Sequence, residues 1–137
     1  MKFHFIIYKY YDVKTAYKSG SLQKPLQAQN RFFANLGFET NAKENSSQWR
    51  FDYTVHTLGK QRLPNTGPNP LVYQLEKYSS SYSLMNAQVT KVFSNVFELY
   101  FGGENLTNYT QNNPVLGADN PFGANFDTSI VYAPIMG

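Results

Sequence analysis

Apolar and polar side chains alternate with a period of two along much of the chain, and this alternation predicts β-strands. The clearest segment is 48–58 (QWRFDYTVHTL), where apolar residues hold the odd positions up to Val55 and polar residues hold the even positions up to His56. Similar segments lie at about 2–13, at 30–40, at 82–93, from Val96 onward and at 125–133. No stretch has a convincing helical period. We therefore expect an all-β protein of about six strands.

Most of these segments have one apolar face and one polar face. The apolar residues hold the even positions of 30–40 and the odd positions of 82–93, where Lys91 interrupts the apolar side near its end. In 2–13 both faces carry apolar residues, so its two faces stay ambiguous. Strands of this kind separate apolar from wet surroundings.

The connections between the predicted strands alternate in length: long, short, long, short, long. The two short ones are the polar stretch 41–47 and the tight turn at Ser94-Asn95. Outer-membrane barrels combine short periplasmic turns with longer extracellular loops, whereas long irregular loops are uncommon in compact soluble domains. The pattern favours an antiparallel, up-and-down meander within a transmembrane β-barrel. Alternating strands also build soluble sandwiches and small soluble barrels, and that alternative stays open on pattern alone.

Composition supports strands in apolar surroundings. Charged residues make up 15% of the chain and aromatic residues 17%, with 11 Tyr and 11 Phe; a typical soluble domain has about 25% charged residues. The mean hydropathy of −0.46 and the lack of a long apolar run exclude helical spans. The basic residues are scattered, so we expect no nucleic-acid partner. The absence of cysteine excludes disulfides and thiolate metal sites.

The candidate chemistry of the sequence is sparse. His4 and His56 have no second ligand at metal spacing, so we expect polar-face positions and neither a metal site nor a cofactor. Glu98 and Glu104 share a face, but no catalytic partner or pocket is identifiable, and we assign no catalytic residue. The glycine pair 102–103 lacks the spacing of a phosphate-binding loop and is interpreted as a close backbone approach or a bulge. The polar loop 105–125 carries oxygen donors that could meet a ligand or calcium.

Several motifs resemble those of one large group of TonB-dependent outer-membrane receptors. They read GKQRLP, LMNAQVTK, YFGGENLTN, NP followed by NPFGANFD, and PIMG, and they lie at 59–64, 84–91, 100–108, 113–127 and 134–137. Looser matches lie at 8–14 and 24–27. The matches follow the order and spacing of the family and span nearly the whole chain.

The chain departs from that family in three ways. It has no plug domain or TonB box and no recognisable signal peptide. It stops after the turn that precedes the family's final strand. About six strands also cannot close a barrel of roughly 22 strands, and open sheet edges would leave amides unsatisfied in hydrocarbon. The sequence therefore predicts that residues 1–137 are the C-terminal portion of a receptor barrel, as a fragment or truncated reading frame.

The resemblance implies a function for the parent protein. The parent would bind a scarce nutrient outside the cell (an iron chelate, cobalamin, an oligosaccharide or a peptide) and move it inward with energy from TonB. Its expected location is the outer membrane, and its expected partners are outer-membrane lipid, the remainder of the barrel and plug, and TonB. The alternative is a small soluble β-sandwich or barrel that binds an apolar ligand or a glycan. A hydrolase lacks a nucleophile–base pair, so we expect no enzyme. The ligand-binding residues stay unknown.

Overall fold

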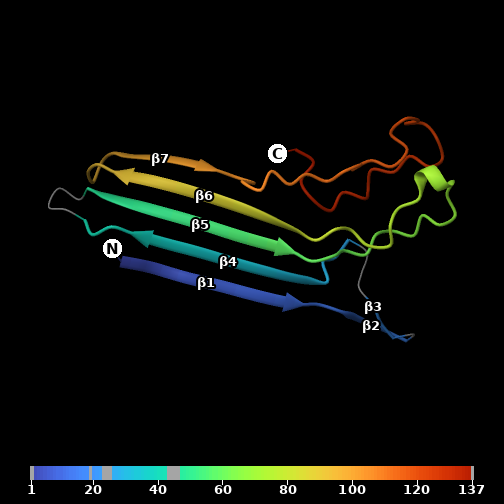
Figure 1. Cartoon of the computed structure of the whole chain (residues 1–137), viewed down its shortest axis with the longest axis horizontal. Helices are drawn as coiled ribbons and strands as arrows, with labels where there is room; N and C mark the ends of the chain where they lie inside the picture. Colours follow the sequence, from blue (N-terminus) through green and yellow to red (C-terminus); the bar gives the residue numbers. More distant parts are fainter. Residues whose placement is uncertain (1, 19, 23–25, 43–46, 137) are drawn as a thin grey trace. The chain divides into compact units, whose positions relative to one another are not determined.

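The computed structural model describes residues 2–18, 20–22, 26–42 and 47–136. The chain is all-β, apart from one short 3-10 helix among the described residues (Figure 1). Its elements are β1 (Lys2–Asp12), β2 (Thr15–Tyr17), β3 (Gly20–Leu22), β4 (Asn30–Glu39), β5 (Gln48–Leu58), η1 (Leu71–Tyr73), β6 (Tyr82–Val92) and β7 (Glu98–Gly103). Five of the six predicted strands are confirmed, and the bounds of β5 are those the alternation predicted.

The described residues form two compact units, each made of three chain segments. Unit 1 comprises Met1–Tyr10, Arg31–Thr57 and Ser83–Asn108. Unit 2 comprises Tyr11–Asn30, Leu58–Tyr82 and Tyr109–Gly137. Unit 1 thus holds most of the long strands together with the two short connections, whereas unit 2 holds most of the long connections.

The five long strands form one antiparallel meander in the order β1-β4-β5-β6-β7 (Figure 1). In the pairing of β6 with β7, Ala87 lies opposite Gly103 and Val92 lies opposite Glu98. At the short connection before β5, Thr40 N donates to Trp49 O at 2.9 Å. A short connection after β6 is confirmed, but it is longer than the predicted two residues: Phe93 N donates to Phe97 O at 3.0 Å, with residues 94–96 between them. The sheet therefore grows by neighbouring strands in chain order.

One face of this sheet is apolar. Phe38 of β4 stacks on Phe51 of β5 with ring centroids 4.8 Å apart, and Tyr53 Oη lies 3.1 Å from Met85 Sδ of β6. The face continues onto β7, where Leu99 and Phe101 remain 60% and 83% exposed. Leu36 of β4 and Trp49 of β5 are also exposed, at 38% and 42%, so the sheet presents an open apolar surface.

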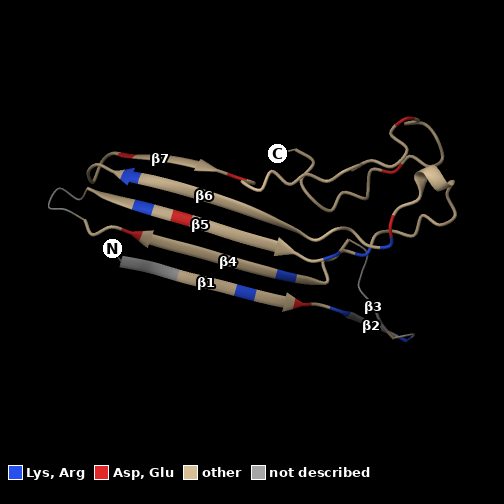
Figure 2. Cartoon of the chain, viewed as in Figure 1, with Lys and Arg blue, Asp and Glu red and all other residues tan. Residues whose placement is uncertain are grey.

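The opposite face of the sheet carries the charged and polar residues of β4, β5 and β7. Arg50 of β5 forms ion pairs with Glu39 of β4 at 3.7 Å and with Glu98 of β7 at 3.6 Å. Asn35 Nδ2 donates to Thr54 Oγ1 at 2.9 Å on the same face. Figure 2 shows that charged positions on the strands are few. The two faces follow from the period-two alternation, because successive side chains of a strand point to opposite sides.

The motif GKQRLP forms the middle of unit 2. It continues in extended form after β5 and bonds to backbone on both of its sides. Toward residues 26–30, Gln29 N donates to Lys60 O and Leu26 N donates to Arg62 O, both at 2.8 Å. On the other side, Ser79 N donates to Gln61 O at 2.8 Å. Backbone pairing on both sides makes this motif a structural centre of the unit.

The strand predicted at 125–133 is wrong. Within this range the structure has only an isolated bridge, in which Asp127 pairs with Leu116. From residue 130 onward, side chains supply the hydrogen-bond partners that a neighbouring strand would otherwise supply. Gln111 Oε1 accepts from Tyr132 N at 2.8 Å, and Gln111 Nε2 donates to Ile130 O at 3.2 Å. Ile130 and Ala133 are buried, at 2% and 9% exposure, although the segment belongs to no sheet.

Unit 2 also contains a small hairpin that the alternation did not predict. Strands β2 and β3 pair with Thr15 opposite Leu22 and with Tyr17 opposite Gly20. Gly20 has a φ of 124°, which only glycine adopts readily. The hairpin lies inside the first long connection, where each strand has only three residues and therefore no readable period.

Candidate functional site

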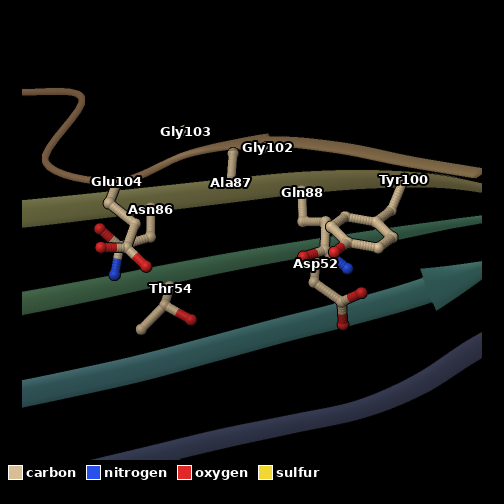
Figure 3. Close-up of a pocket in the computed structure, with 9 residues that line it drawn as sticks. All are labelled: Asp52, Thr54, Asn86, Ala87, Gln88, Tyr100, Gly102, Gly103 and Glu104. Atoms are coloured by element: carbon tan, nitrogen blue, oxygen red, sulfur yellow. The ribbon is translucent and has the colours of Figure 1, made fainter.

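The polar face of unit 1 has a hollow of about 450 Å³ above β5, β6 and β7 (Figure 3). Its lining consists of Asp52, Thr54, Asn86, Ala87, Gln88, Tyr100, Gly102, Gly103 and Glu104. The polar members of the three strands hold even-numbered positions, so the period-two geometry points them to one side of the sheet. A volume of this size suits a small molecule or one residue of a larger ligand.

Gly102 brings the wall of the hollow close to the strand beside it. A Cβ atom at this position would lie 2.9 Å from the Ala87 carbonyl oxygen, which is closer than real Cβ contacts. This geometry confirms a close backbone approach at Gly102, whereas a Cβ atom at Gly103 would meet the side chain of Leu106. Any other residue would push β7 away from β6 at the edge of the hollow.

The loop after β7 is held against β6 by three hydrogen bonds. Asn105 N donates to Asn86 Oδ1 at 2.9 Å, Leu106 N donates to Met85 O at 2.7 Å, and Thr107 Oγ1 donates to Ser83 O at 2.7 Å. Asn105 adopts a φ of 47°, which asparagine tolerates better than most residues. These bonds fix Glu104 at the rim, immediately before the loop.

The hollow is acidic. Asp52 and Glu104 line it, and no Lys, Arg or His does. The nearest basic residue along β5, Arg50, is occupied by ion pairs with Glu39 and Glu98. Carboxylates accept hydrogen bonds, and amide side chains both donate and accept them. The chemistry of the site therefore suits a ligand rich in hydroxyl, amide or cationic groups. Tyr100, 67% exposed, offers an aromatic face for stacking.

The structure separates the residues singled out from the sequence. Glu104 lines the hollow, but Glu98 lies with Arg50 in an ion pair. His56 meets Phe33 edge-on with ring centroids 6.1 Å apart. His4 lies in β1, but its side chain is outside the described part of the structure. Among the described residues, no three His, Asp or Glu side chains gather into a group that could hold a metal ion.

The polar loop 105–125, whose oxygen donors we expected to face a ligand or calcium, has residues in both units that make hydrogen bonds within their own unit. Its first residues bond to β6 within unit 1, whereas Asp119 belongs to unit 2 and accepts a hydrogen bond from Tyr73 Oη at 2.7 Å. That hydrogen bond raises the pKa of the Tyr73 hydroxyl above its ordinary value. Thr107 and Asp119 thus both take part in hydrogen bonds within the chain.

Sequence reasoning missed Asp52, Thr54, Asn86, Gln88 and Tyr100 as members of one site. The sequence does mark each of them as a polar-face position of its strand. What it lacks is the register, in which Gln88 lies opposite Gly102 and Tyr100 lies opposite Thr90. That register depends on backbone pairing between strands. The alternation does not determine it, because a shift of one strand by two residues keeps every side chain on the same face.

A second cluster lies on the apolar face, near the short connections. Lys91 Nζ lies 4.9 Å from the ring centroid of Trp49 and 5.8 Å from that of Phe93. It also bonds to Ser47 Oγ at 2.9 Å. Lys91 occupies an apolar-face position of β6. Its contacts with Ser47, Trp49 and Phe93 hold its ammonium group toward the end of the sheet. The contacts with the two rings are cation–π interactions.

The fold and the hollow define an all-β protein with an open, two-faced antiparallel sheet and a polar surface site. Comparison with family models, curated proteins and solved structures gives no match to this chain. No helix in the described ranges is long and apolar enough to cross a membrane.

Proposed function

We propose that this chain forms wall strands of an outer-membrane receptor that takes up a scarce nutrient with energy supplied by TonB. The nutrient classes are an iron chelate, cobalamin, an oligosaccharide or a peptide. The observation that carries the proposal is the open apolar face of β4, β5, β6 and β7, which lies opposite a polar face with a hollow. The ordered motifs that resemble TonB-dependent receptors supply the receptor class.

Lipid is the natural neighbour of the apolar face. In a transmembrane barrel the outward side chains meet hydrocarbon, and the inward ones meet water or a plug. Phe51, Leu99 and Phe101 would then face lipid, and Asp52 and Glu98 would face the lumen. Strands β1 and β7 are the edges of the sheet, and the remainder of the barrel would pair with them and satisfy their free backbone groups.

The cluster around Lys91 supports the same placement. Aromatic residues form girdles at both membrane interfaces of barrels, and lysine extends its stem along apolar surface to put its ammonium group in the headgroup region. Trp49, Phe93 and Lys91 have this combination of side chains. In the proposed barrel they would mark the interface next to the short periplasmic turns.

The polar hollow would lie on the lumen side of the wall. Its carboxylates, amides and tyrosine suit transient contacts with a polar nutrient or with the plug. The site contributes positioning and no chemical step, and we assign it no catalytic residue.

Detergent dependence tests this proposal. We expect the chain to stay folded in micelles or vesicles and to aggregate once detergent is removed, because the apolar face then meets water. Size-exclusion chromatography with light scattering and far-UV circular dichroism, each with and without detergent, measure the difference. A chain that is monomeric and unfolds cooperatively without detergent would sink the membrane proposal. That result would favour a soluble β-sandwich or barrel that binds an apolar ligand or a glycan.

A further inference from the structure

Unit 2 contains a second hollow, of about 410 Å³, that differs in charge from the first. One side of the hollow is formed by residues 62–67, which include the end of the GKQRLP motif. The other side is formed by the segment that ends at Lys77. Its lining includes Arg62, Leu63, Pro64, Leu75 and Lys77. Figure 2 shows basic positions in the stretch that follows β5.

The walls of this hollow are built by internal hydrogen bonds. Leu63 N donates to Lys77 O at 3.0 Å, and Arg62 forms an isolated bridge with Tyr78, so the two segments of the wall are joined. Thr66 is 8% exposed, and its Oγ1 accepts from Leu75 N at 2.7 Å. Gln74 Nε2 closes the loop by donating to Asn69 O at 2.9 Å. A hollow held in this way needs little rearrangement to receive a ligand, which lowers the entropic cost of binding.

The lining combines two cations with apolar surface. Arg62 and Lys77 line the hollow, and no Asp or Glu does. Glu76 is next to Lys77 in the chain but is not part of the lining. No ion pair within the described ranges joins Arg62 or Lys77 to a carboxylate. The guanidinium of arginine matches the geometry of carboxylate and phosphate, and lysine adds a point charge.

We propose that this hollow binds a small organic oxyanion. The carboxylate or phosphate group would lie between Arg62 and Lys77, and a short apolar body would pack on Leu63, Pro64 and Leu75. This inference rests on unit 2 alone and does not depend on the proposed membrane placement of the sheet. A failure of one therefore leaves the other standing.

Butyl phosphate and pentanoate are suitable probes, with inorganic phosphate and butylamine as comparisons. With the full chain kept folded in amphipol, we expect both organic anions to bind more tightly than inorganic phosphate, and butylamine not to bind. Titration followed by amide chemical shifts at Thr66 and Gly67 reports on the hollow directly. Whichever of the two organic anions binds more tightly identifies the headgroup chemistry. Equal binding of butyl phosphate and inorganic phosphate would overturn the role of the apolar wall.

Arg62→Gln and Lys77→Gln should each weaken binding of butyl phosphate by about tenfold, because each removes a charge-assisted contact. The matched control is Lys60→Gln, an exposed cation of the same motif that does not line the hollow; its binding should stay within about twofold. Arg62→Lys keeps the positive charge but removes the planar guanidinium. A loss of affinity smaller than that of Arg62→Gln would show how much of the binding depends on the charge alone. An equal loss in Lys60→Gln, or no binding of any anion by the folded wild-type chain, would refute the site.

Discussion

In the proposed membrane barrel, arginine in place of Phe51 is expected to destabilise the protein by about 2–4 kcal/mol, the cost of a charge on the lipid face near the bilayer midplane. Phe51 stacks on Phe38 of β4 and lies 6.4 Å from the Trp49 ring centroid on the apolar face, so the substitution also removes aromatic packing. Urea unfolding of the proposed parent barrel in vesicles, followed by tryptophan fluorescence, measures the change in the free energy of unfolding.

Asp52→Arg is the matched control, one residue further along the same strand and on the opposite face. Because Asp52 lines the polar hollow, this change should cost less than about 1 kcal/mol. The same comparison on β7 should give the same result: arginine at Leu99 should destabilise the protein more than arginine at Glu98. Equal losses on the two faces would indicate that both are buried in protein, as in the core of a sandwich.

Leucine in place of Gln111 is expected to destabilise unit 2 by roughly 3–5 kcal/mol. The side chain is 6% exposed and bonds to the main chain of three residues: Ile130 O at 3.2 Å, Tyr132 N at 2.8 Å and Ala133 N at 3.3 Å. Each buried backbone group left without a partner costs about 1–3 kcal/mol. Hydrogen exchange of the Tyr132 and Ala133 amides should accelerate with the fall in the free energy of unfolding.

The neighbouring Asn112 supplies the control for that experiment. Asn112 is exposed, so Asn112→Leu should change stability by less than about 0.5 kcal/mol and leave amide exchange at 132 and 133 unaltered. If Gln111→Leu behaves like Asn112→Leu, the glutamine does not hold the segment from residue 130 onward.

The sheet is predictable from sequence because its strands are long and alternate. In β5 the polar side chains from Arg50 to His56 mark one face, and the apolar ones mark the other. The segment 125–133 shows some of the same alternation but is not a strand. Its backbone partners come from Gln111, Gln61 and Tyr82: Gln61 Nε2 and Tyr82 Oη both donate to Tyr132 O, at 3.2 and 2.7 Å. No periodicity in the sequence encodes partners of this kind.

The candidate site is only half predictable. The alternation identifies Asp52, Gln88 and Tyr100 as polar-face residues, but their meeting in one hollow depends on strand register. The close approach at Gly102 is suggested by the glycine itself, whereas the basic hollow of unit 2 is not suggested at all. Arg62 and Lys77 lie on two segments of the chain, and the backbone pairing of Leu63 with Lys77 joins these segments into one wall.

The central claim, that one face of the sheet meets lipid and the other does not, is tested most directly by spin-label accessibility along β5. The chain contains no cysteine, so single cysteines at Phe51, Asp52, Tyr53 and Thr54 can each carry a nitroxide label in the proposed parent barrel in vesicles. Oxygen concentrates in hydrocarbon, and a water-soluble nickel chelate does not. The account predicts that labels at 51 and 53 respond to oxygen and that labels at 52 and 54 respond to nickel. The account would be contradicted if labels at 51 and 53 were as accessible to nickel as labels at 52 and 54.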